Sequence, residues 1–529
     1  MIRVRQVKVN INEDNIDNIK KKASKKLFVR PDQIKDIRIY EQSIDARCKP
    51  DIYFVYTVDV SVDNEEYVLN RCKSNDVLIT PKEEYVFNIT GTDTLSKRPI
   101  IVGMGPAGLL CAYILAENGY KPLIIDRGEP VEDRVKTIEE FWSTGKLLTN
   151  SNVQFGEGGA GTFSDGKLVS QVKDSSFRRK KVFSIFVECG ASPEIMYVNK
   201  PHIGTDKLRE IIKNMRNKII DMGGEFRYST CLTDIILENN KIKSIEVNNN
   251  EIIDTDILVL ALGHSARDTF KMLYDKNINM EGKPFAVGIR IQHPQDMINK
   301  NQYGLVSHPK LGAASYKLTY KASNGRGVYS FCMCPGGYVV NASSENNRLV
   351  VNGMSNYKRD GENANSALIV TITPKDFGEH PLDGIKFQRD LEEKAYKLGN
   401  GLIPIQTYLD YKNNVESTKL GSIEPIFKGN YKLSNINEVF PSYINESLKE
   451  AIEYFNNKIH GYSNSDAIVA AVESRTSSPL KILRDDNGVC NIDGVYPCGE
   501  GAGYAGGITS AAIDGMKVAE FIAQKYKNN

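Results

Sequence analysis

The chain has 529 residues, which is too long for one ordinary core and suggests three or more domains of roughly 100 to 200 residues each. Hydrophobic residues make up 41% and charged residues 25%, the balance of a soluble globular protein rather than of a disordered or membrane chain. The formal net charge of +2 says little about partners. Residues 1–15 lack the apolar core of a signal peptide, and apolar runs such as Ile257–Leu262 are too short to cross a bilayer. We therefore expect a cytoplasmic protein with no membrane contact.

Residues 1–95 predict a small α+β domain of their own. Hydrophobic alternation predicts strands in Ile2–Ile11 and Tyr53–Val62, and helical spacing predicts a helix over Asp14–Lys26. A basic face that can meet RNA or another anionic partner is formed by Lys20, Lys21, Lys22, Lys25 and Lys26. A lysine-rich helix face is more often simply solvated, so nucleic acid is a disfavoured partner. A turn-rich stretch, Thr90–Lys97, separates this domain from the next.

A dinucleotide-binding pattern follows. Pro99–Gly103 predicts a buried strand, Pro106–Asn118 a helix and Lys121–Ile125 a second strand. The turn between the first two contains Gly103, Gly105, Pro106, Ala107 and Gly108. The first glycine permits the tight turn, the second lets the backbone approach a pyrophosphate, and the third lets helix and strand pack closely. The N-terminus of the helix then offers free N–H groups and a positive dipole end to the phosphates.

Asp126 stands at the end of the second predicted strand. An acidic side chain there accepts hydrogen bonds from ribose hydroxyls and repels a 2′-phosphate, so the adenosine half of the ligand is not NADP-like. Arg127 and Arg134 follow closely, and each can either pair with phosphate or face solvent.

A second glycine-rich element near the C-terminus favours FAD over NAD. Asp254–His264 predicts a buried strand that ends in a turn at Gly263. Gly494–Glu500, which contains Gly499, predicts another, and Gly501–Gly507 then opens a helix over Ile508–Lys525. Two such elements suit an elongated FAD, with Glu500 on ribityl hydroxyls and the second helix N-terminus at the flavin. The alternative is a glycine-rich loop at a domain junction. Because no second strand–GxGxxG–helix unit appears, any NAD(P)H must bind transiently, or electrons must come from another donor.

Seven segments spread over nearly the whole chain carry a family resemblance: Gly103–Gly128, Phe155–Leu168, Leu260–Thr269, Phe285–Gln295, Tyr329–Val340, Ala471–Pro479 and Tyr496–Gly515. In these segments the chain resembles a widespread bacterial family of largely uncharacterised FAD-dependent dehydrogenases, within the glutathione-reductase-like flavoprotein superfamily. The resemblance implies FAD contacts at Gly103, Gly105, Gly108, Asp126, Gly158, Gly159, Glu500, Gly506 and Gly507. Many relatives outside this family have aspartate where Glu500 stands. The resemblance does not supply a substrate.

The predicted fold class is α/β with α+β additions. A Rossmann-type FAD-binding domain is assembled from two discontinuous segments, residues 96–280 and 466–529. Between them, residues 281–465 form a substrate or cap domain with a mixed β-sheet, and residues 1–95 form the small N-terminal domain.

Cys332 and Cys334 are the first candidates for the chemistry. They follow a predicted strand, Gly327–Phe331, where alternate residues share a face but lie roughly 6.5 Å or more apart, too far for an unstrained disulfide. A turn at Pro335–Gly336 can bring them closer. One interpretation is a redox-active thiol beside the flavin; the other, slightly favoured, is two packed cysteines. A metal site is not predicted, because no second CxC or histidine pair completes a tetrahedral set.

Several charged residues are further candidates. Glu473 and Arg475 lie in a segment predicted as helix then loop, Asp466–Pro479, whose charges can face an active-site cavity. Arg475, Arg290 and Arg267 can grip a substrate carboxylate or serve as internal ion-pair partners. His264 and His293 can donate protons or be structural.

The sequence thus predicts an FAD-dependent oxidoreductase that transfers hydride between the flavin and an unidentified small organic substrate. Two alternatives remain. One is a flavin-linked thiol–disulfide enzyme using Cys332 and Cys334, and the other is a flavin-binding protein that associates with RNA or has a regulatory role.

Overall fold

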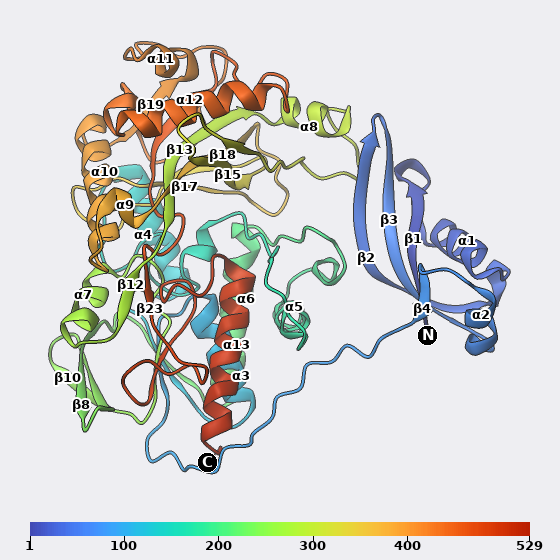
Figure 1. Cartoon of the computed structure of the whole chain (residues 1–529), viewed down its shortest axis with the longest axis horizontal. Helices are drawn as coiled ribbons and strands as arrows, with labels where there is room; N and C mark the ends of the chain where they lie inside the picture. Colours follow the sequence, from blue (N-terminus) through green and yellow to red (C-terminus); the bar gives the residue numbers. More distant parts are fainter. Residues whose placement is uncertain (529) are drawn as a thin grey trace.

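The N-terminal domain stands beside the rest of the molecule in the computed structural model, which describes residues 1–528 (Figure 1). Its four-stranded antiparallel sheet has the order β2-β3-β1-β4. The elements are β1 (Ile2–Asn10), α1 (Ile16–Leu27), β2 (Ile34–Cys48), β3 (Asp51–Val62), α2 (Glu65–Arg71) and β4 (Val77–Ile79). Helix α1 begins where the Asn15 side chain accepts the N–H of Asn18, and its apolar face covers the sheet. The first four elements follow the predicted order of strand, helix, strand, strand, whereas α2 and β4 were not predicted.

An extended segment, residues 80–99, joins this domain to the main body (Figure 1). Part of it pairs with the C-terminal helix α13 (Ile508–Lys525) and the residues that follow. The N–H of Gly91 donates to Ala523 O at 2.9 Å, and that of Asp93 to Lys525 O at 3.1 Å. The stretch predicted as a turn-rich separator is therefore tied to the far end of the described chain.

A five-stranded parallel sheet forms the centre of the second domain, with the order β24-β11-β5-β6-β7. Its strands are β5 (Ile100–Val102), β6 (Leu123–Ile125), β7 (Glu225–Arg227), β11 (Leu258–Leu260) and β24 (Val495–Pro497). Side chains alternate between its two faces. Ile101 and Val259 pack against helices, including α3 (Pro106–Glu117), α5 (Arg178–Glu188), α6 (Thr205–Asp221) and α13, whereas Ile100 and Leu258 pack on the other side.

That other side is covered by a three-stranded antiparallel sheet that we did not predict. Its strands are β8 (Leu232–Glu238), β9 (Lys241–Val247) and β10 (Glu251–Asp254), in the order β10-β9-β8. The same domain also contains α4 (Val131–Thr144) and α7 (Arg267–Asp275). The observed fold is thus mixed α/β around a parallel sheet to which both distant parts of the chain contribute strands.

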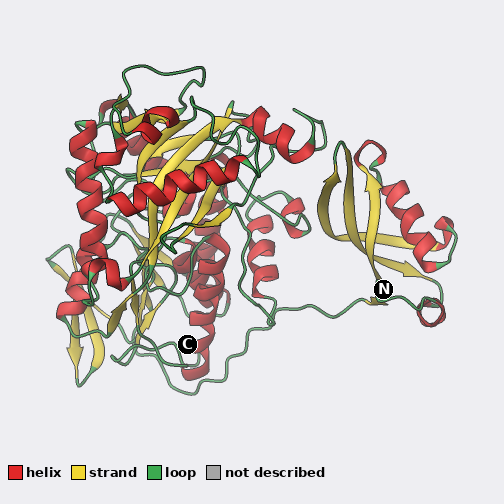
Figure 2. Ribbon diagram, turned by 45° about the horizontal axis from the view of Figure 1, so that its top comes forward, coloured by secondary structure: helices red, strands yellow, loops and turns green. Residues whose placement is uncertain are grey.

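The cap domain is built on a seven-stranded mixed sheet with the order β14-β15-β18-β13-β22-β19-β21. Its strands are β13 (Phe285–Pro294), β14 (Thr319–Lys321), β15 (Gly327–Cys334), β18 (Asn363–Ile372), β19 (Ile403–Thr407), β21 (Tyr431–Leu433) and β22 (Ile468–Glu473). Helices pack around this sheet (Figure 2): α8 (Gln295–Tyr303), α9 (Pro374–Phe377), α10 (Asp383–Gly399), α11 (Tyr408–Asn413) and α12 (Ser442–Asn456). Smaller sheets join β16 (Tyr338–Asn341), β17 (Val351–Met354) and β20 (Phe427–Lys428), and β12 (Met280–Gly282) with β23 (Leu480–Ile482).

The prediction of a helix around Glu473 is wrong. Residues Ile468–Glu473 form β22, which pairs with β13 and β19 inside the cap sheet, and all six side chains are buried. A short, continuous apolar run is compatible with either a buried strand or a buried helix segment. The chain therefore returns to the parallel sheet only after this strand.

Candidate functional site

Two glycines of the turn after β5 cannot carry a side chain without a backbone clash. Gly103 has φ +105°, and a Cβ atom there would overlap the Ala261 carbonyl oxygen. A Cβ on Gly108 would overlap the carbonyl oxygen of Gly103, so this residue lets α3 approach the strand. Helix α3 is capped by Gly105 and has Pro106 in its first turn, where the missing N–H of proline does no harm. The strand, turn and helix have the arrangement of a dinucleotide-binding unit.

A second glycine loop, residues 156–159, packs on this turn. The N–H of Gly158 donates to Met104 O at 2.8 Å, and a Cβ on Gly159 would come within 2.9 Å of the Gly105 Cα. Gly158 and Gly159 both have positive φ, at +84° and +63°. The resemblance placed these two glycines at the cofactor, and the structure brings them against the first glycine turn.

Arg134 holds this loop in place from the interior of the domain. We expected its side chain either to pair with phosphate or to face solvent. Its side chain is fully buried. The guanidinium donates to backbone carbonyl oxygens of Asn152, Val153, Gly156, Glu157 and Gly159. Burial lowers the pKa of Arg134 to about 10, so it remains charged at neutral pH. The expectation of a phosphate or solvent contact is corrected to a structural role.

Asp126 lies at the carboxyl end of β6 and joins three parts of the site. Its Oδ2 accepts the N–H of Met104 at 2.9 Å, while Oδ1 accepts those of Gly128 at 2.9 Å and Gly156 at 3.0 Å. A carboxylate oxygen can accept about two hydrogen bonds, so Oδ2 retains capacity for a ribose hydroxyl. The ribose contact stays a prediction.

Arg127 does not point freely at phosphate or solvent. It makes a bidentate ion pair with Asp268 at 2.9 Å and lies 4.5 Å from the centre of the Phe155 ring. Its side chain is 11% exposed. This residue ties the end of β6 to α7, which corrects the predicted alternatives.

The C-terminal glycine element meets the same turn. A Cβ on Gly499 would lie 2.6 Å from the Ala107 Cβ, and one on Gly515 would overlap the Ala107 carbonyl oxygen, so α13 crosses the first turn of α3. Gly507 caps α13, and Ile508 begins it. Nothing lies within 4 Å of a Cβ built on Gly263 or Gly506. The N-termini of α3 and α13 therefore lie close together, and their role in holding a cofactor stays a prediction.

Glu500 and His264 lie next to this element. His264 Nε2 is 4.0 Å from Glu500 Oε1, and the two side chains are 11% and 27% exposed. Burial raises the pKa of Glu500 to about 7, opposed by Lys283 and reinforced by Cys332. Burial, with Arg475 and Arg267 nearby, lowers the pKa of His264 to about 3. Glu500 is therefore the better proton carrier near neutral pH, and His264 is a neutral imidazole rather than the proton donor we considered.

His293 is structural. It is fully buried on β13, its Nε2 lies 2.7 Å from Tyr462 O, and burial lowers its pKa to about 4. Of the two roles considered for it, burial and the bond to a backbone carbonyl favour the structural one.

Arg475 and Arg267 share one buried carboxylate, that of Glu392. Arg475 bonds it at 3.0 and 2.9 Å, and Arg267 bonds it twice at 2.8 Å. Glu392 is fully buried, and the two guanidinium groups hold its pKa well below its usual range despite the opposing effect of burial. Both arginines are internal ion-pair partners, which was the alternative to gripping a substrate.

Arg290 and Glu473 make a second buried pair. Arg290 Nε donates to Glu473 Oε2 at 2.8 Å, and its other nitrogens bond Asn365 and Asn352 at 2.7 and 2.9 Å. Burial raises the pKa of Glu473, although Arg290 opposes this. Glu473 is 2% exposed, so its carboxylate pairs with Arg290 in the protein interior and does not face a cavity.

Cys332 and Cys334 lie next to this pair, in a bulge of β15. The register with β18 breaks between Phe331 and Cys334, and Cys332 has φ +42°. Arg290 Nη1 donates to Cys332 O at 3.0 Å, and Lys167 Nζ donates to Met333 O. We missed Lys167 and Lys283 as neighbours of the site. Lys167 lies in Phe155–Leu168, one of the segments that carry the family resemblance. Its partner, Met333, is 166 positions away in the sequence.

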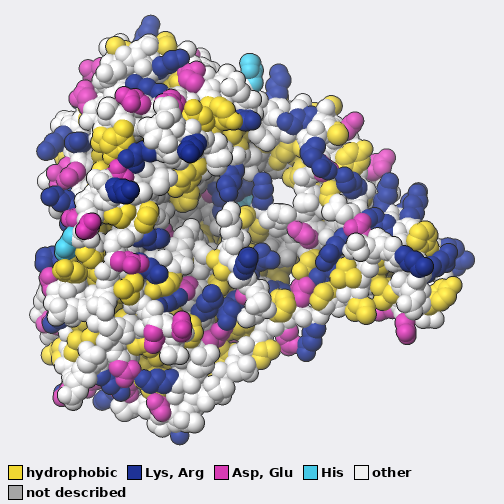
Figure 3. All heavy atoms as spheres, in the orientation of Figure 1, with side chains coloured by type: hydrophobic (Ala, Val, Ile, Leu, Met, Phe, Trp, Pro, Cys, Tyr) yellow, Lys and Arg dark blue, Asp and Glu magenta, His cyan; other side chains and the backbone are white. Residues whose placement is uncertain are grey.

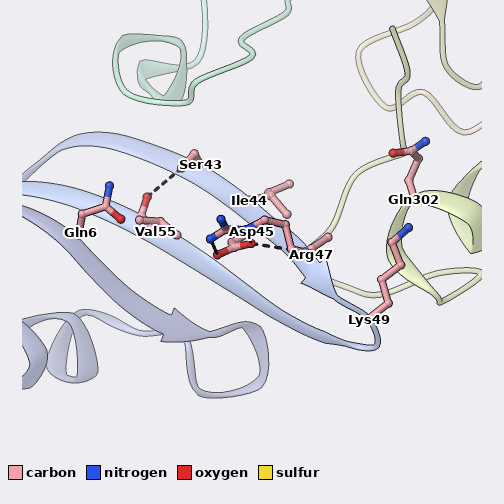
Figure 4. A pocket seen from close by; sticks show the side chains of 9 residues that line it. Gln6, Ser43, Ile44, Asp45, Arg47, Lys49, Val55 and Gln302 are labelled. Atoms are coloured by element: carbon pink, nitrogen blue, oxygen red, sulfur yellow. Dashed lines mark hydrogen bonds and ion pairs between the residues drawn. The ribbon is translucent and has the colours of Figure 1, made fainter. Parts of the chain in front are cut away.

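Two hollows have different characters. Figure 3 shows the molecule hollowed between the cap and the dinucleotide-binding domain, with Lys and Arg side chains gathered around the hollow. Figure 4 shows an open hollow beside the β2–β3 hairpin, where Asp45 pairs with Arg47 at 2.7 Å and Lys49 reaches Asn301 O. The second hollow lies between the N-terminal domain and α8, away from the glycine turns.

Within residues 1–528, no three His, Cys, Asp or Glu side chains converge so as to hold a metal ion. No helix of the described chain combines the length and apolar character needed to span a bilayer.

The chain is similar to other proteins over nearly its full length. A relative named "Uncharacterized protein" from Clostridium beijerinckii is 46% identical over 531 residues, covering 99% of each chain. Residues 284–476 match the family model "FAD-dependent protein, C-terminal domain-like", and residues 1–61 match a "Domain of unknown function (DUF8436)".

Solved structures resemble it more distantly. L-proline dehydrogenase from P. horikoshii is 15% identical, with a TM-score of 0.35 over 81% of this chain and 94% of that one. Glycine oxidase from Bacillus cereus is 12% identical, with a TM-score of 0.31 over 82% and 96%. With scores this low, neither match decides what this chain does. The full-length relative and the matched domain do settle the family: the chain belongs to the FAD-dependent protein family.

Proposed function

We propose that the chain binds FAD and uses it to oxidise or reduce a small organic substrate. One observation carries this proposal: two glycine-rich helix N-termini from distant parts of the chain meet at the carboxyl edge of one parallel sheet, with open space at Gly263 and Gly506. Ligands of open α/β sheets bind at this edge. An elongated dinucleotide with a pyrophosphate and a second, flavin-bearing half matches two such N-termini better than NAD does.

The residues present fit FAD. The first turn of α3 and Asp126 would hold the ADP half, where N–H groups and a positive dipole end favour phosphate. Glu500, Gly507 and the first turn of α13 would hold the ribityl and flavin half. Bound there, FAD supplies hydride transfer. Glu500 can hold or release a proton at its carboxyl near neutral pH, and the N-terminus of α13 favours negative charge.

The cap domain would form the part of the site that binds the substrate. Within residues 1–528 one sheet carries a glycine turn of the dinucleotide-binding kind, so any NAD(P)H would bind transiently as electron donor. The substrate is a small molecule that enters between the cap and the dinucleotide-binding domain, where Figure 3 shows the hollow.

Purified protein tests FAD binding directly. We expect flavin absorbance that survives desalting and releases FAD on denaturation. Gly108→Val should lose it, because the new side chain would overlap the Gly103 carbonyl, whereas Gly312→Ala should retain it, because nothing lies within 4 Å of a Cβ there. Circular dichroism of both variants checks that they fold. A wild-type protein that is colourless and does not take up added FAD would refute the proposal.

A further inference from the structure

We propose that Cys332 and Cys334 form a dithiol–disulfide redox pair whose substrate is a small disulfide: Cys332 attacks it and Cys334 resolves the product. This inference rests on the proposed function for one step only, the return of electrons to the pair.

The bulge brings the two thiols together. In a regular strand their sulfurs would share a face at a separation of roughly 6.5 Å or more. Here Cys332 has a left-handed backbone and the pairing with β18 is interrupted, so Cys334 Sγ comes within 3.3 Å of the Cys332 carbonyl oxygen. A left-handed conformation is uncommon for cysteine, and such positions cluster at functional sites.

Two cations flank the pair from different domains. Arg290 of the cap sheet lies 3.9 Å from Cys334 Sγ through Nη1, which also bonds the Cys332 carbonyl. Lys167, which follows the glycine loop, reaches the carbonyl of Met333 between the two cysteines. Each cation is partly balanced by a carboxylate: Glu473 pairs with Arg290, and Asp165 pairs with Lys167 at 3.0 Å and also with Arg359.

These surroundings give the two thiols different roles. The neighbouring Cys334 thiol, with Lys167 and Arg290, holds the pKa of Cys332 well below its usual range, while burial raises the pKa of Cys334. Cys332 is partly exposed and Cys334 fully buried. The thiolate is the nucleophile in disulfide exchange, so Cys332 attacks and Cys334 waits as the resolving thiol.

The reaction balances. The Cys332 thiolate attacks one sulfur of the substrate R–S–S–R′; a bond from Cys332 to that sulfur forms, and R′S⁻ leaves and takes up a proton. Cys334 then loses its proton and attacks the Cys332 sulfur, expelling the second thiolate, which is also protonated. The substrate gains two electrons and two protons, and the protein gains one disulfide. Two electrons and two protons must reopen it, for which the proposed function offers reduced FAD as donor.

Other cysteines lack this setting. Cys111 and Cys498 are both fully buried in the helical side of the dinucleotide-binding domain, and burial raises the pKa of each. Cys48 is exposed on the N-terminal domain. It serves as a control for general thiol reactivity.

The test uses full-length protein as purified, reduced and then equilibrated with mixtures of reduced and oxidised dithiothreitol. After acid quenching and alkylation, peptide mass spectrometry should show the peptide with both cysteines losing two hydrogens as the mixture becomes more oxidising. With oxidised glutathione, Cys334→Ser should trap an adduct on Cys332, Cys332→Ser should give none at Cys334, and Cys48→Ser should behave as wild type.

A second test changes Lys167, one of the two cations beside the cysteines. Lys167→Met should raise the pKa of Cys332, so the pH at which its alkylation rate is half-maximal should move upward by about one unit. Lys173→Met, an exposed lysine in the same loop, should leave that pH unchanged.

Absence of the Cys332–Cys334 disulfide in wild-type protein at every mixture would overturn the proposal, as would failure of Cys334→Ser to trap glutathione. The visible spectrum of the same samples reports flavin separately. A disulfide without flavin would therefore contradict the proposed function alone, and flavin without a disulfide would contradict this inference alone.

Discussion

Removing the charge of Glu392 tests whether Arg267 and Arg475 are structural. Glu392→Gln keeps the shape of the side chain but leaves two buried guanidinium groups facing an amide, part of which is itself a donor. Glu345, 20% exposed, is the other carboxylate near both arginines. Breaking a buried ion pair by removing one partner costs about 3–5 kcal/mol. At about 2–4 °C per kcal/mol for a domain of 150–250 residues, we expect the thermal unfolding midpoint to fall by roughly 6 to 20 °C.

The matched control is the next residue. Glu393 pairs with Arg348 at 2.8 Å but is 39% exposed, so Glu393→Gln should cost no more than about 1 kcal/mol. Differential scanning fluorimetry and urea unfolding of both variants, in one buffer, give the comparison. Equal midpoints for the two variants would refute this reasoning. So would a Glu392→Gln protein of normal stability that has lost only substrate affinity, because the arginines would then serve the substrate.

Three other changes follow from the site. Glu500→Gln should abolish a step near pH 7 in the pH profile of activity, which Glu281→Gln, an exposed control, should keep. Because the folded-state pKa of Glu500 is raised, wild-type stability should also fall as pH rises from about 4.5 to about 7, and the variant should not show this fall. Asp126→Ala leaves three backbone N–H groups without their acceptor and should weaken FAD retention on the order of tenfold, measured by flavin release on dilution. Arg134→Met should lower the free energy of unfolding by about 3 kcal/mol or more, because buried carbonyl oxygens lose their donors. An unfolding midpoint that calorimetry finds unchanged would contradict the structural role of Arg134.

The parts that sequence predicted are those set by local rules. The glycine turn, α3 and α13 depend on residues within a few positions of one another, and α13 has the predicted bounds, Ile508–Lys525. The sheet β8–β10 could have been found in the same way, because its strands alternate and its turns contain Asn239–Asn240 and Asn248–Asn249, all with positive φ.

The roles of the charged residues could not be read in that way. Arg475 is defined by Glu392, 83 positions away, and Arg290 by Glu473, 183 positions away. An arginine in a sequence carries the same charge whether its partner is a substrate or a buried glutamate. Only the folded chain decides which of the two it meets, and here it meets glutamate in both cases.

The pairing of α13 with early parts of the chain has a consequence for how the protein is made. Tyr120 donates to Tyr526 O across 406 residues, and Tyr85 bonds Glu520 across 435. At about 5–20 residues per second, the ribosome needs roughly 20 to 80 seconds to deliver these partners. The N-terminal sheet closes on local contacts and can fold during this interval. Helix α3, with ten buried residues, must wait for α13. A nascent chain should therefore need chaperone protection longest at this helix. The N-termini of α3 and α13 cannot bind a dinucleotide together until α13 has left the ribosome.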